Sequence, residues 1–500
     1  IQGVNIMSKK AIQMNSVQEI FVFVISLTFM FLFRFIPPFG TVTPYGMALL
    51  GIFIGVIFGW CFGGNNTLWT SLLGLFALGI TMQGGVLVAC MQVFSSYVFI
   101  IVMLSLFTIG ALMDANIGEY LVVKILSVKF IQGHPWRLVL LLFLGTYFLS
   151  FATNPMVIGI FLLNVYATMF KQAGYKPGDK TPTMIILATV IIALLETINR
   201  PWQTPQIIAI QALQGATGIE TPYGPYMFAV IIFSIIFIVA MVLLMRIMKC
   251  DVEKLTNIDL SDLQEQYKDG LSTHQKGVLI ATLVLAIGSI VLVFFPTNLG
   301  IISTFVTSQV TIIGWMVLIV AIMLFVKIDG KLLLSPQVLA TNFPWPLLMM
   351  IGVGVTLGSA VVGEGTGVSE WIGGLLGPAL VSMGETTFYI ILAAAGVILT
   401  NLLNNNAMAI MLSSIVASLY LQGVVADPIL AILIVIVSTT FGFVTPASSF
   451  YGALIHGNEF VEAKSIYKYG IIMAFFSWLL TIVLFVPISN ICFSILTINL

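Results

Sequence analysis

Two clusters of amide and hydroxyl side chains interrupt long apolar runs of this chain. The clusters are Thr153-Asn154-Pro155, within "FLSFATNPMVIGIF", and Asn404-Asn405-Asn406, within "LTNLLNNNAMAIML". An asparagine side chain has one acceptor oxygen and two N–H donors, so it can bind a cation or an anion. Two Thr-Pro pairs follow the clusters, Thr204-Pro205 and Thr445-Pro446. Because proline breaks a helix, each pair exposes free carbonyls that suit Na+ and free amides that suit a carboxylate.

The composition around these clusters is that of a membrane protein. The chain has 500 residues, of which 59% are hydrophobic and 8% are charged, whereas a globular domain carries about 25% charged residues. The net charge is zero and no long basic or acidic run exists, so nothing indicates a nucleic-acid partner. The four cysteines have no metal-ligand spacing, which argues against both a disulfide framework and a zinc site.

We predict an all-α polytopic protein with eleven transmembrane helices and two re-entrant helical hairpins. A spanning helix needs about 20 apolar residues, and such runs lie near 18–37, 43–62, 68–92, 96–113, 183–213, 226–248, 277–296, 302–326, 345–363, 428–456 and 469–493. The expected hairpins cover 137–170 and 386–420, with the two amide clusters at their tips. The expected broken helices are 183–213 and 428–456, each interrupted at its Thr-Pro pair.

The positive charges predict how the chain is oriented. Lys and Arg concentrate in cytoplasmic loops, and seventeen of the nineteen fall on one side if the N-terminus is inside. The other two, Arg34 and Arg200, lie within spans. We therefore expect a multi-pass protein of the cytoplasmic (plasma) membrane, with its N-terminus inside and its C-terminus outside.

The two halves of the chain repeat the same landmarks in the same order. Asn154 and Asn405 are 251 residues apart, and a Thr-Pro pair follows each of them. Five spans separate the copies, so the copies face opposite ways across the membrane. The expected parts are the N-terminal segment and first helix (1–42), the first inverted repeat (43–248), a cytoplasmic linker (249–276) and the second inverted repeat (277–493). Inverted repeats of this kind are typical of secondary transporters, whose substrate site lies between the repeats.

At these residues the chain resembles the divalent anion/sodium symporter family, within the wider ion transporter superfamily. That family carries Ser-Asn-Thr at both hairpin tips and a Thr-Pro loop in each half. Here only the central asparagines, Asn154 and Asn405, match the tips. The resemblance implies an elevator-type transporter fold, a homodimer, and a di- or tricarboxylate or sulfate as substrate.

Glu196 and Arg200 are the main departure from that pattern. They lie four residues apart just before the first break, where each charge costs at least about 2.5 kcal/mol on insertion scales. One interpretation is that the Arg200 guanidinium replaces the first Na+ site or clamps a substrate carboxylate. The other is that the two side chains only neutralise each other.

The sequence thus predicts a secondary active transporter of a small anion, a di- or tricarboxylate, coupled to Na+ or working by exchange. No covalent cofactor is expected, and the partners are the anion, membrane lipid and a second copy of the chain. The predicted substrate-binding residues are Thr153, Asn154, Pro155, Arg200, Thr204, Pro205, Asn404, Asn405, Asn406, Thr445 and Pro446. The predicted Na+ ligands are Asn154, Thr204, Asn405, Thr445 and Ala447.

Three other kinds of function compete with this one. A proton-coupled transporter or an oxyanion exporter of a related branch would use the same architecture. An anion channel can also contain re-entrant loops, but it does not need two inverted broken-helix modules. An enzyme is disfavoured, because the chain has no HExxH motif, no paired intramembrane aspartates and no Ser-His dyad.

Overall fold

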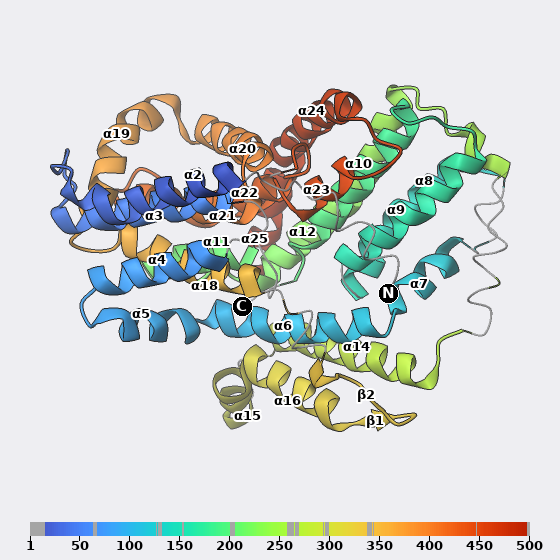
Figure 1. Cartoon of the computed structure of the whole chain (residues 1–500), viewed down its shortest axis with the longest axis horizontal. Helices are drawn as coiled ribbons and strands as arrows, with labels where there is room; N and C mark the ends of the chain where they lie inside the picture. The colour runs from blue at the N-terminus through green and yellow to red at the C-terminus, as the bar shows by residue number, and fades with distance from the viewer. Residues whose placement is uncertain are drawn as a thin grey trace.

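The structure is a computed structural model that describes residues 16–63, 68–126, 128, 133–152, 155–200, 206–257, 265, 270–293, 295, 300–337, 343, 345–446 and 448–497. This part of the chain is almost entirely helical, as predicted (Figure 1). The exception is a short antiparallel pair, β1 (Lys327–Ile328) and β2 (Lys331–Leu332), which follows α16.

The helices of the first half run from the N-terminus to the linker. They are α2 (Ser16–Leu27), η2 (Thr28–Leu32), η3 (Phe33–Phe35), α3 (Pro44–Phe62), α4 (Leu68–Thr81), α5 (Gly85–Phe94), α6 (Tyr97–Asp114), α7 (Ile117–Leu126), α8 (Pro135–Ala152), α9 (Pro155–Gln172), α10 (Lys180–Glu196), α11 (Gln206–Thr217), α12 (Tyr223–Ile247) and η5 (Glu253–Asn257).

The helices of the second half follow the linker. They are α14 (Thr273–Val293), α15 (Ile301–Thr304), η6 (Phe305–Val310), α16 (Thr311–Phe325), α18 (Trp345–Val362), α19 (Val368–Met383), α20 (Glu385–Leu402), α21 (Asn405–Leu421), α22 (Pro428–Thr440), α23 (Phe450–His456), α24 (Ala463–Leu480), η7 (Thr481–Phe485) and α25 (Val486–Thr497).

Eight helices in the described ranges are long and apolar enough to cross a bilayer, or nine if α5 and α6 form one bent span. The remaining expected spans consist of shorter helices, so the count of eleven stays a prediction. One expected span, 68–92, is wrong as a continuous helix. The chain reverses after α4, and α5 packs back along it (Figure 1).

Glycine explains this reversal between α4 and α5. Gly84 and Gly85 both adopt positive φ angles, of 96° and 77°, which only glycine adopts readily. A Cβ on Gly79 would overlap the Val86 backbone, so the absence of a side chain lets the two helices approach closely. Arg34 Nη2 donates to Thr81 Oγ1 at 2.6 Å, which holds the end of α4 against the end of the first helix.

Both predicted hairpins are pairs of helices that pack against each other. In the first, α8 and α9 flank residues 153–154, and Pro155 begins α9. In the second, α20 and α21 flank Leu403 and Asn404. Each pair packs on the first segment of a broken helix: α8 and α9 on α10, and α20 and α21 on α22. The two halves therefore share one local arrangement of hairpin and broken helix.

The first segments of the broken helices are the most deeply buried parts of the molecule. Every residue of α10 from Thr181 to Glu196 is buried, and so is nearly every residue of α22. A helix that is apolar around its whole circumference belongs in an interior. The hairpins and their neighbours supply that interior.

The buried side chains form two hydrophobic cores. The hairpin core is built from α8, α9, α10, α12, α20, α22 and α24. The flanking core is built from α3, α4, α5, α6, α14, α16 and α18. The second segment of the first broken helix, α11, and the second arm of the second hairpin, α21, contribute to both cores and pack along each other. These two helices are the principal link between the cores.

Loops that were predicted to share a side of the membrane touch one another. On the side with the positive charges, the pairs are Lys171 with Glu459 (2.7 Å), Gly178 N with Phe460 O (3.1 Å), Ser465 Oγ with Gly178 O (2.9 Å) and Gln275 Nε2 with Ala115 O (2.8 Å). On the other side, Thr43 N donates to Thr366 O at 2.9 Å. These contacts agree with the predicted sidedness, and which side is cytoplasmic stays a prediction.

Candidate functional site

The start of the second break, residues 441–445, is fixed by one asparagine on the preceding hairpin. Asn401 Oδ1 accepts hydrogen bonds from Phe443 N (3.0 Å) and Val444 N (2.9 Å), and Asn401 Nδ2 donates to Phe441 O (2.7 Å). In return, Thr445 Oγ1 donates to Asn401 O at 2.6 Å. Asn401 was absent from the predicted site. Its signal in the sequence is an amide near the end of a hairpin arm, four residues before Asn405.

The second hairpin tip contacts this break directly. Asn405 N donates to Ser448 O at 3.0 Å, so the predicted residues Asn405 and Thr445 belong to one cluster. The acceptor oxygen of Asn404 caps α21, since it accepts from Asn406 N (3.0 Å) and Ala407 N (3.2 Å). Asn405 Oδ1 also accepts from Asn406 N, at 2.9 Å.

The side-chain oxygens of Asn404 and Asn405 thus accept backbone hydrogen bonds inside the tip, and the Na+ role of Asn405 stays a prediction. Within the described chain, the side-chain N–H groups of Asn404, Asn405 and Asn406 make no hydrogen bond. These three amides are half-buried. These free N–H groups are donors, which suit an anion.

The first break begins after α10, where side chains satisfy the free carbonyls. Tyr226 Oη donates to Ile198 O at 2.6 Å. The Gln206 amide, with its nitrogen towards the break, donates to Arg200 O (2.6 Å) and Ile198 O (2.9 Å). Tyr147 Oη donates to Asn199 Oδ1 at 2.8 Å. Because the backbone bends here inside a buried region, these bonds replace the lost helical ones.

Arg200 and Glu196 form a buried ion pair at this break. Arg200 Nη2 lies 3.0 Å from Glu196 Oε2, and the side chains are 6% and 0% exposed. The same nitrogen donates to Ser150 O at 3.3 Å, and the guanidinium carbon lies 5.8 Å from the centre of the Phe151 ring. Ser150 and Phe151 are near the end of α8, so Arg200 joins the broken helix to the first hairpin.

Three polar atoms around this ion pair are buried and find no partner in the described parts of the chain. They are Arg200 Nε, Glu196 Oε1 and Ser150 Oγ. Buried polar atoms are hydrogen-bonded in most proteins, and an unsatisfied group costs about 1–3 kcal/mol. Three such atoms in one place therefore mark a site that a polar solute or water can complete.

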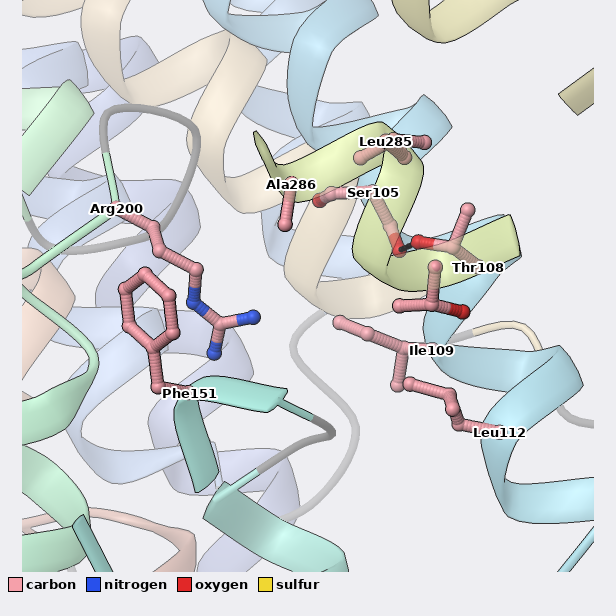
Figure 2. Close-up of a pocket in the computed structure, with 9 residues that line it drawn as sticks. Ser105, Thr108, Ile109, Leu112, Phe151, Arg200, Leu285 and Ala286 are labelled. Carbon is pink, nitrogen blue, oxygen red and sulfur yellow. Dashed lines mark hydrogen bonds between the residues drawn. The ribbon is translucent and has the colours of Figure 1, made fainter. Parts of the chain in front are cut away.

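The Arg200 guanidinium points into a small cavity of about 10 Å³ (Figure 2). Its lining comes from three places: Ser105, Thr108, Ile109 and Leu112 on α6; Thr282, Leu285 and Ala286 on α14; and Phe151 with Arg200. Helices α6 and α14 belong to the flanking core, whereas α8 and α10 belong to the hairpin core. The cavity therefore lies at the boundary between the two cores.

Tyr451 on α23, the helix after the second break, is buried against the first hairpin. Its ring lies 3.3 Å from where a Cβ on Gly159 of α9 would be. The helix that follows the second break thus contacts the first hairpin.

The predicted site residues have different outcomes. Arg200, Pro155, Asn404, Asn405, Asn406, Thr445 and Pro446 are described, and the last five gather where the second hairpin meets the second break. Thr153, Asn154, Thr204, Pro205 and Ala447 lie outside the described residues. The Na+ set that includes Asn154 and Thr204 therefore stays a prediction.

Comparison with known proteins defines the class and then the family. The fold is similar to the crystal structure of the YdaH transporter from Alcanivorax borkumensis, with a TM-score of 0.54 and 14% identity over 84% of this chain and 87% of that one. The chain thus has the fold of a multi-pass membrane transporter. A family model described as citrate transporter matches residues 11–442. The chain belongs to this family, which confirms the resemblance noted in the sequence. No curated protein matches it.

Proposed function

We propose that this protein is a secondary active transporter that carries citrate or a similar di- or tricarboxylate across the membrane. The observation that supports it best is the buried Arg200 guanidinium, which points into a cavity between two separate hydrophobic cores. Charged side chains inside a membrane protein are rare and mark substrate pathways. A guanidinium is also the side chain whose geometry best matches a carboxylate.

The hydrogen bonds of Arg200 leave room for such a substrate. Its Nη2 atom serves Glu196 and Ser150, while Nε and Nη1 make no hydrogen bond to a described residue. A guanidinium has five N–H groups, so three of them remain for a carboxylate. Glu196 balances the charge while the site is empty, which lowers the cost of burying Arg200.

The second hairpin tip supplies further donors for the same substrate. The free side-chain N–H groups of Asn404, Asn405 and Asn406 lie beside the second break. Tyr451, on the helix after that break, packs against Gly159 of the first hairpin. A di- or tricarboxylate has more than one anionic group, so Arg200 and the amide tip can hold different ends of it.

The division into two cores supports a mechanism of alternating access. In the proposed elevator movement, the hairpins and broken helices shift as one body against the flanking core, and the cavity opens to each side in turn. Coupling is to Na+ at the hairpin and Thr-Pro residues, or by exchange of anions. A homodimer would hold the flanking cores in place in the membrane.

The test is uptake of labelled citrate into proteoliposomes that contain the purified full-length protein. Saturable uptake that unlabelled di- and tricarboxylates inhibit is expected. Arg200→Gln should reduce kcat/KM by about 10- to 100-fold, because a hydrogen bond to a charged group contributes about 1.5–3 kcal/mol. The matched control is Arg34→Gln, which removes a second arginine within the spans that does not line the cavity.

Other outcomes would select the alternatives. Non-saturating flux with unitary currents would indicate an anion channel. Uptake that responds to a pH gradient and not to Na+ or internal anion would indicate proton coupling. Transport of oxyanions without carboxylates, or equal activity of Arg200→Gln and wild type, would refute the proposal.

A further inference from the structure

Helix α19 joins the two hydrophobic cores. Val368 and Trp371, at its start, pack in the flanking core, whereas Leu380, near its end, packs against the hairpin core. Gly384 alone separates α19 from α20, the first arm of the second hairpin. Any movement of the second hairpin against the flanking core therefore acts on α19.

The start of α19 is fastened to the flanking core. Thr43, which caps α3, donates from its N–H to Thr366 O at 2.9 Å and from its hydroxyl to Gly365 O at 2.8 Å. The rings of Phe39 and Trp371 pack edge to face, with 5.0 Å between their centres. These contacts fix the start of α19 relative to α3.

The end of α19 is a joint. Gly384 has a φ angle of 78° and a ψ angle of 157°, a backbone conformation that is essentially restricted to glycine. Gly133, which lies 251 residues earlier in the first repeat, also has a positive φ, of 72°. Hinges consist of a few residues at the ends of elements that absorb changes of backbone angle. Gly384 is therefore the position at which the second hairpin can change its angle to α19.

A pocket lies beside this glycine, and we call it the joint pocket. Its volume is about 140 Å³, and its lining comes from the end of α19, the start of α20 and the connection between α21 and α22. An apolar cavity of about 150 Å³ can bind a molecule the size of benzene. The joint pocket thus has room for one small apolar group. Besides Gly384, its lining residues are Leu380, Glu385, Phe388, Val424, Val425 and Ala426.

One carboxylate belongs to this otherwise apolar lining. Glu385 lies in the first turn of α20, and its Oε1 accepts a hydrogen bond from Tyr389 Oη at 2.5 Å. Glu385 forms no ion pair with a described residue, and no lysine or arginine occurs in the sequence between Lys331 and Lys464. A carboxylate accepts hydrogen bonds and attracts positive charge. The joint pocket therefore favours a ligand that combines an apolar group with a positive charge.

We propose that the joint pocket binds a small organic cation, an ammonium on an apolar group about the size of a benzene ring, and that the bound cation slows transport. The second part of this inference rests on the proposed transport function. The ligand would contact α19, α20 and the α21–α22 connection together, so a change of angle at Gly384 would break its contacts. A ligand that binds one arrangement better than another shifts the population towards it. Because the joint pocket shares no residue with the cavity at Arg200, the cation should not compete with citrate.

Binding is measured by thermal unfolding of the purified full-length protein without citrate. The probe is benzylammonium, and benzyl alcohol is its uncharged counterpart of similar size. Benzylammonium should raise the unfolding midpoint of the wild type as its concentration rises, and benzyl alcohol should raise it less at each concentration.

Three variants locate the binding. Glu385→Gln should weaken benzylammonium binding about tenfold, because hydrogen bonds to a charged group are the stronger ones. Ala426→Phe, at an exposed position of the lining, should fill the joint pocket and abolish binding. The matched control is Glu370→Gln, which removes an exposed carboxylate from the first turn of α19, outside the joint pocket. It should bind benzylammonium as the wild type does.

The effect on transport is measured as citrate uptake into phosphatidylglycerol proteoliposomes. Benzylammonium should lower kcat and leave KM for citrate unchanged. Inhibition should need about ten times more benzylammonium in Glu385→Gln and should be absent in Ala426→Phe. Glu370→Gln should be inhibited as the wild type is.

Several results would overturn the inference. Equal binding by the wild type, Glu385→Gln and Ala426→Phe would refute the site, as would equal stabilisation by benzyl alcohol or no stabilisation by benzylammonium. A raised KM would place the cation in the citrate site, and binding without inhibition of an active wild type would refute the inhibitory role. Inhibition that disappears when the vesicles contain phosphatidylethanolamine would assign the joint pocket to a lipid headgroup instead. A wild-type protein that binds benzylammonium but does not take up citrate would refute the proposed function alone.

Discussion

Replacement of Asn401 by alanine should damage the second break more than any other single amide change in the described chain. The Asn401 side chain holds Phe443 N, Val444 N and Phe441 O, at 2.7–3.0 Å. All four residues are buried, with Asn401 8% exposed. In Asn401→Ala these three backbone groups lose their partner in a place where water does not reach them.

The size of the effect follows from these three groups. A buried donor or acceptor left without a partner costs about 1–3 kcal/mol, so three groups give at least about 3 kcal/mol. The bond from Asn401 Nδ2 to Val397 O adds little, because that carbonyl belongs to the helix ladder. A loss of this size is a large fraction of the stability of a typical protein, which is about 5–15 kcal/mol.

The assay compares the unfolding midpoints of detergent-solubilised wild type, Asn401→Ala and Ser413→Ala. Ser413 is a matched control, since it is fully buried on α21 and its hydroxyl has no partner in the described chain. Its removal should leave the midpoint unchanged or raise it slightly. Asn401→Ala should lower the midpoint by several degrees and abolish citrate uptake. If the two variants unfold at the same temperature, the role assigned to Asn401 is wrong.

Three further predictions test other parts of the structure. Arg200→Lys keeps the positive charge but loses the planar guanidinium that can bind a carboxylate through two hydrogen bonds. KM for citrate should therefore rise about tenfold in the uptake assay with little change in kcat, and an unchanged KM would argue against a bidentate contact. A Cβ on Gly396 would overlap Ser438 Oγ, where α20 meets α22, so Gly396→Ala should lower the free energy of unfolding of the protein by about 1–3 kcal/mol. Adding Ser438→Gly should recover most of this loss, and no recovery would refute the packing argument. Burial raises the pKa of the Cys250 thiol to about 11, despite the opposing effect of the Lys180 charge. Because the thiolate is the reactive form of cysteine, the rate of maleimide labelling at Cys250 should rise about tenfold per pH unit from pH 7 to 10. A rate that reaches a plateau by pH 9 would contradict the raised pKa.

The hairpins and broken helices could be predicted because their breaks contain polar residues and prolines. The break at Leu403 and Asn404 falls within the cluster of asparagines, and α10 ends just before the residues around Thr204-Pro205. Water is scarce in a membrane, so amides and prolines within apolar runs are strong signals of interrupted helices.

Other features could not be predicted because their signal depends on tertiary contacts. The reversal between α4 and α5 is set by Gly84, Gly85 and the close approach of Gly79 to Val86, whereas hydropathy continues through all of them. The use of Asn404 as a helix cap and of Asn401 as the partner of the second break depends on backbone geometry. The cavity needs α6 and α14, which are distant from Arg200 in the chain.

Movement of the hairpin core against the flanking core can be tested with one cross-link across the cavity. Ile109 and Phe151 line it from opposite sides (Figure 2). In a protein whose four native cysteines are replaced, cysteines introduced at these two positions can be joined by an oxidant. The native cysteines are Cys61, Cys90, Cys250 and Cys492. The proposed mechanism predicts that oxidation stops citrate uptake and that reduction restores it, while each single-cysteine protein stays active. Full cross-linking with uptake unchanged would show that the two cores do not need to move, and the mechanism would be wrong.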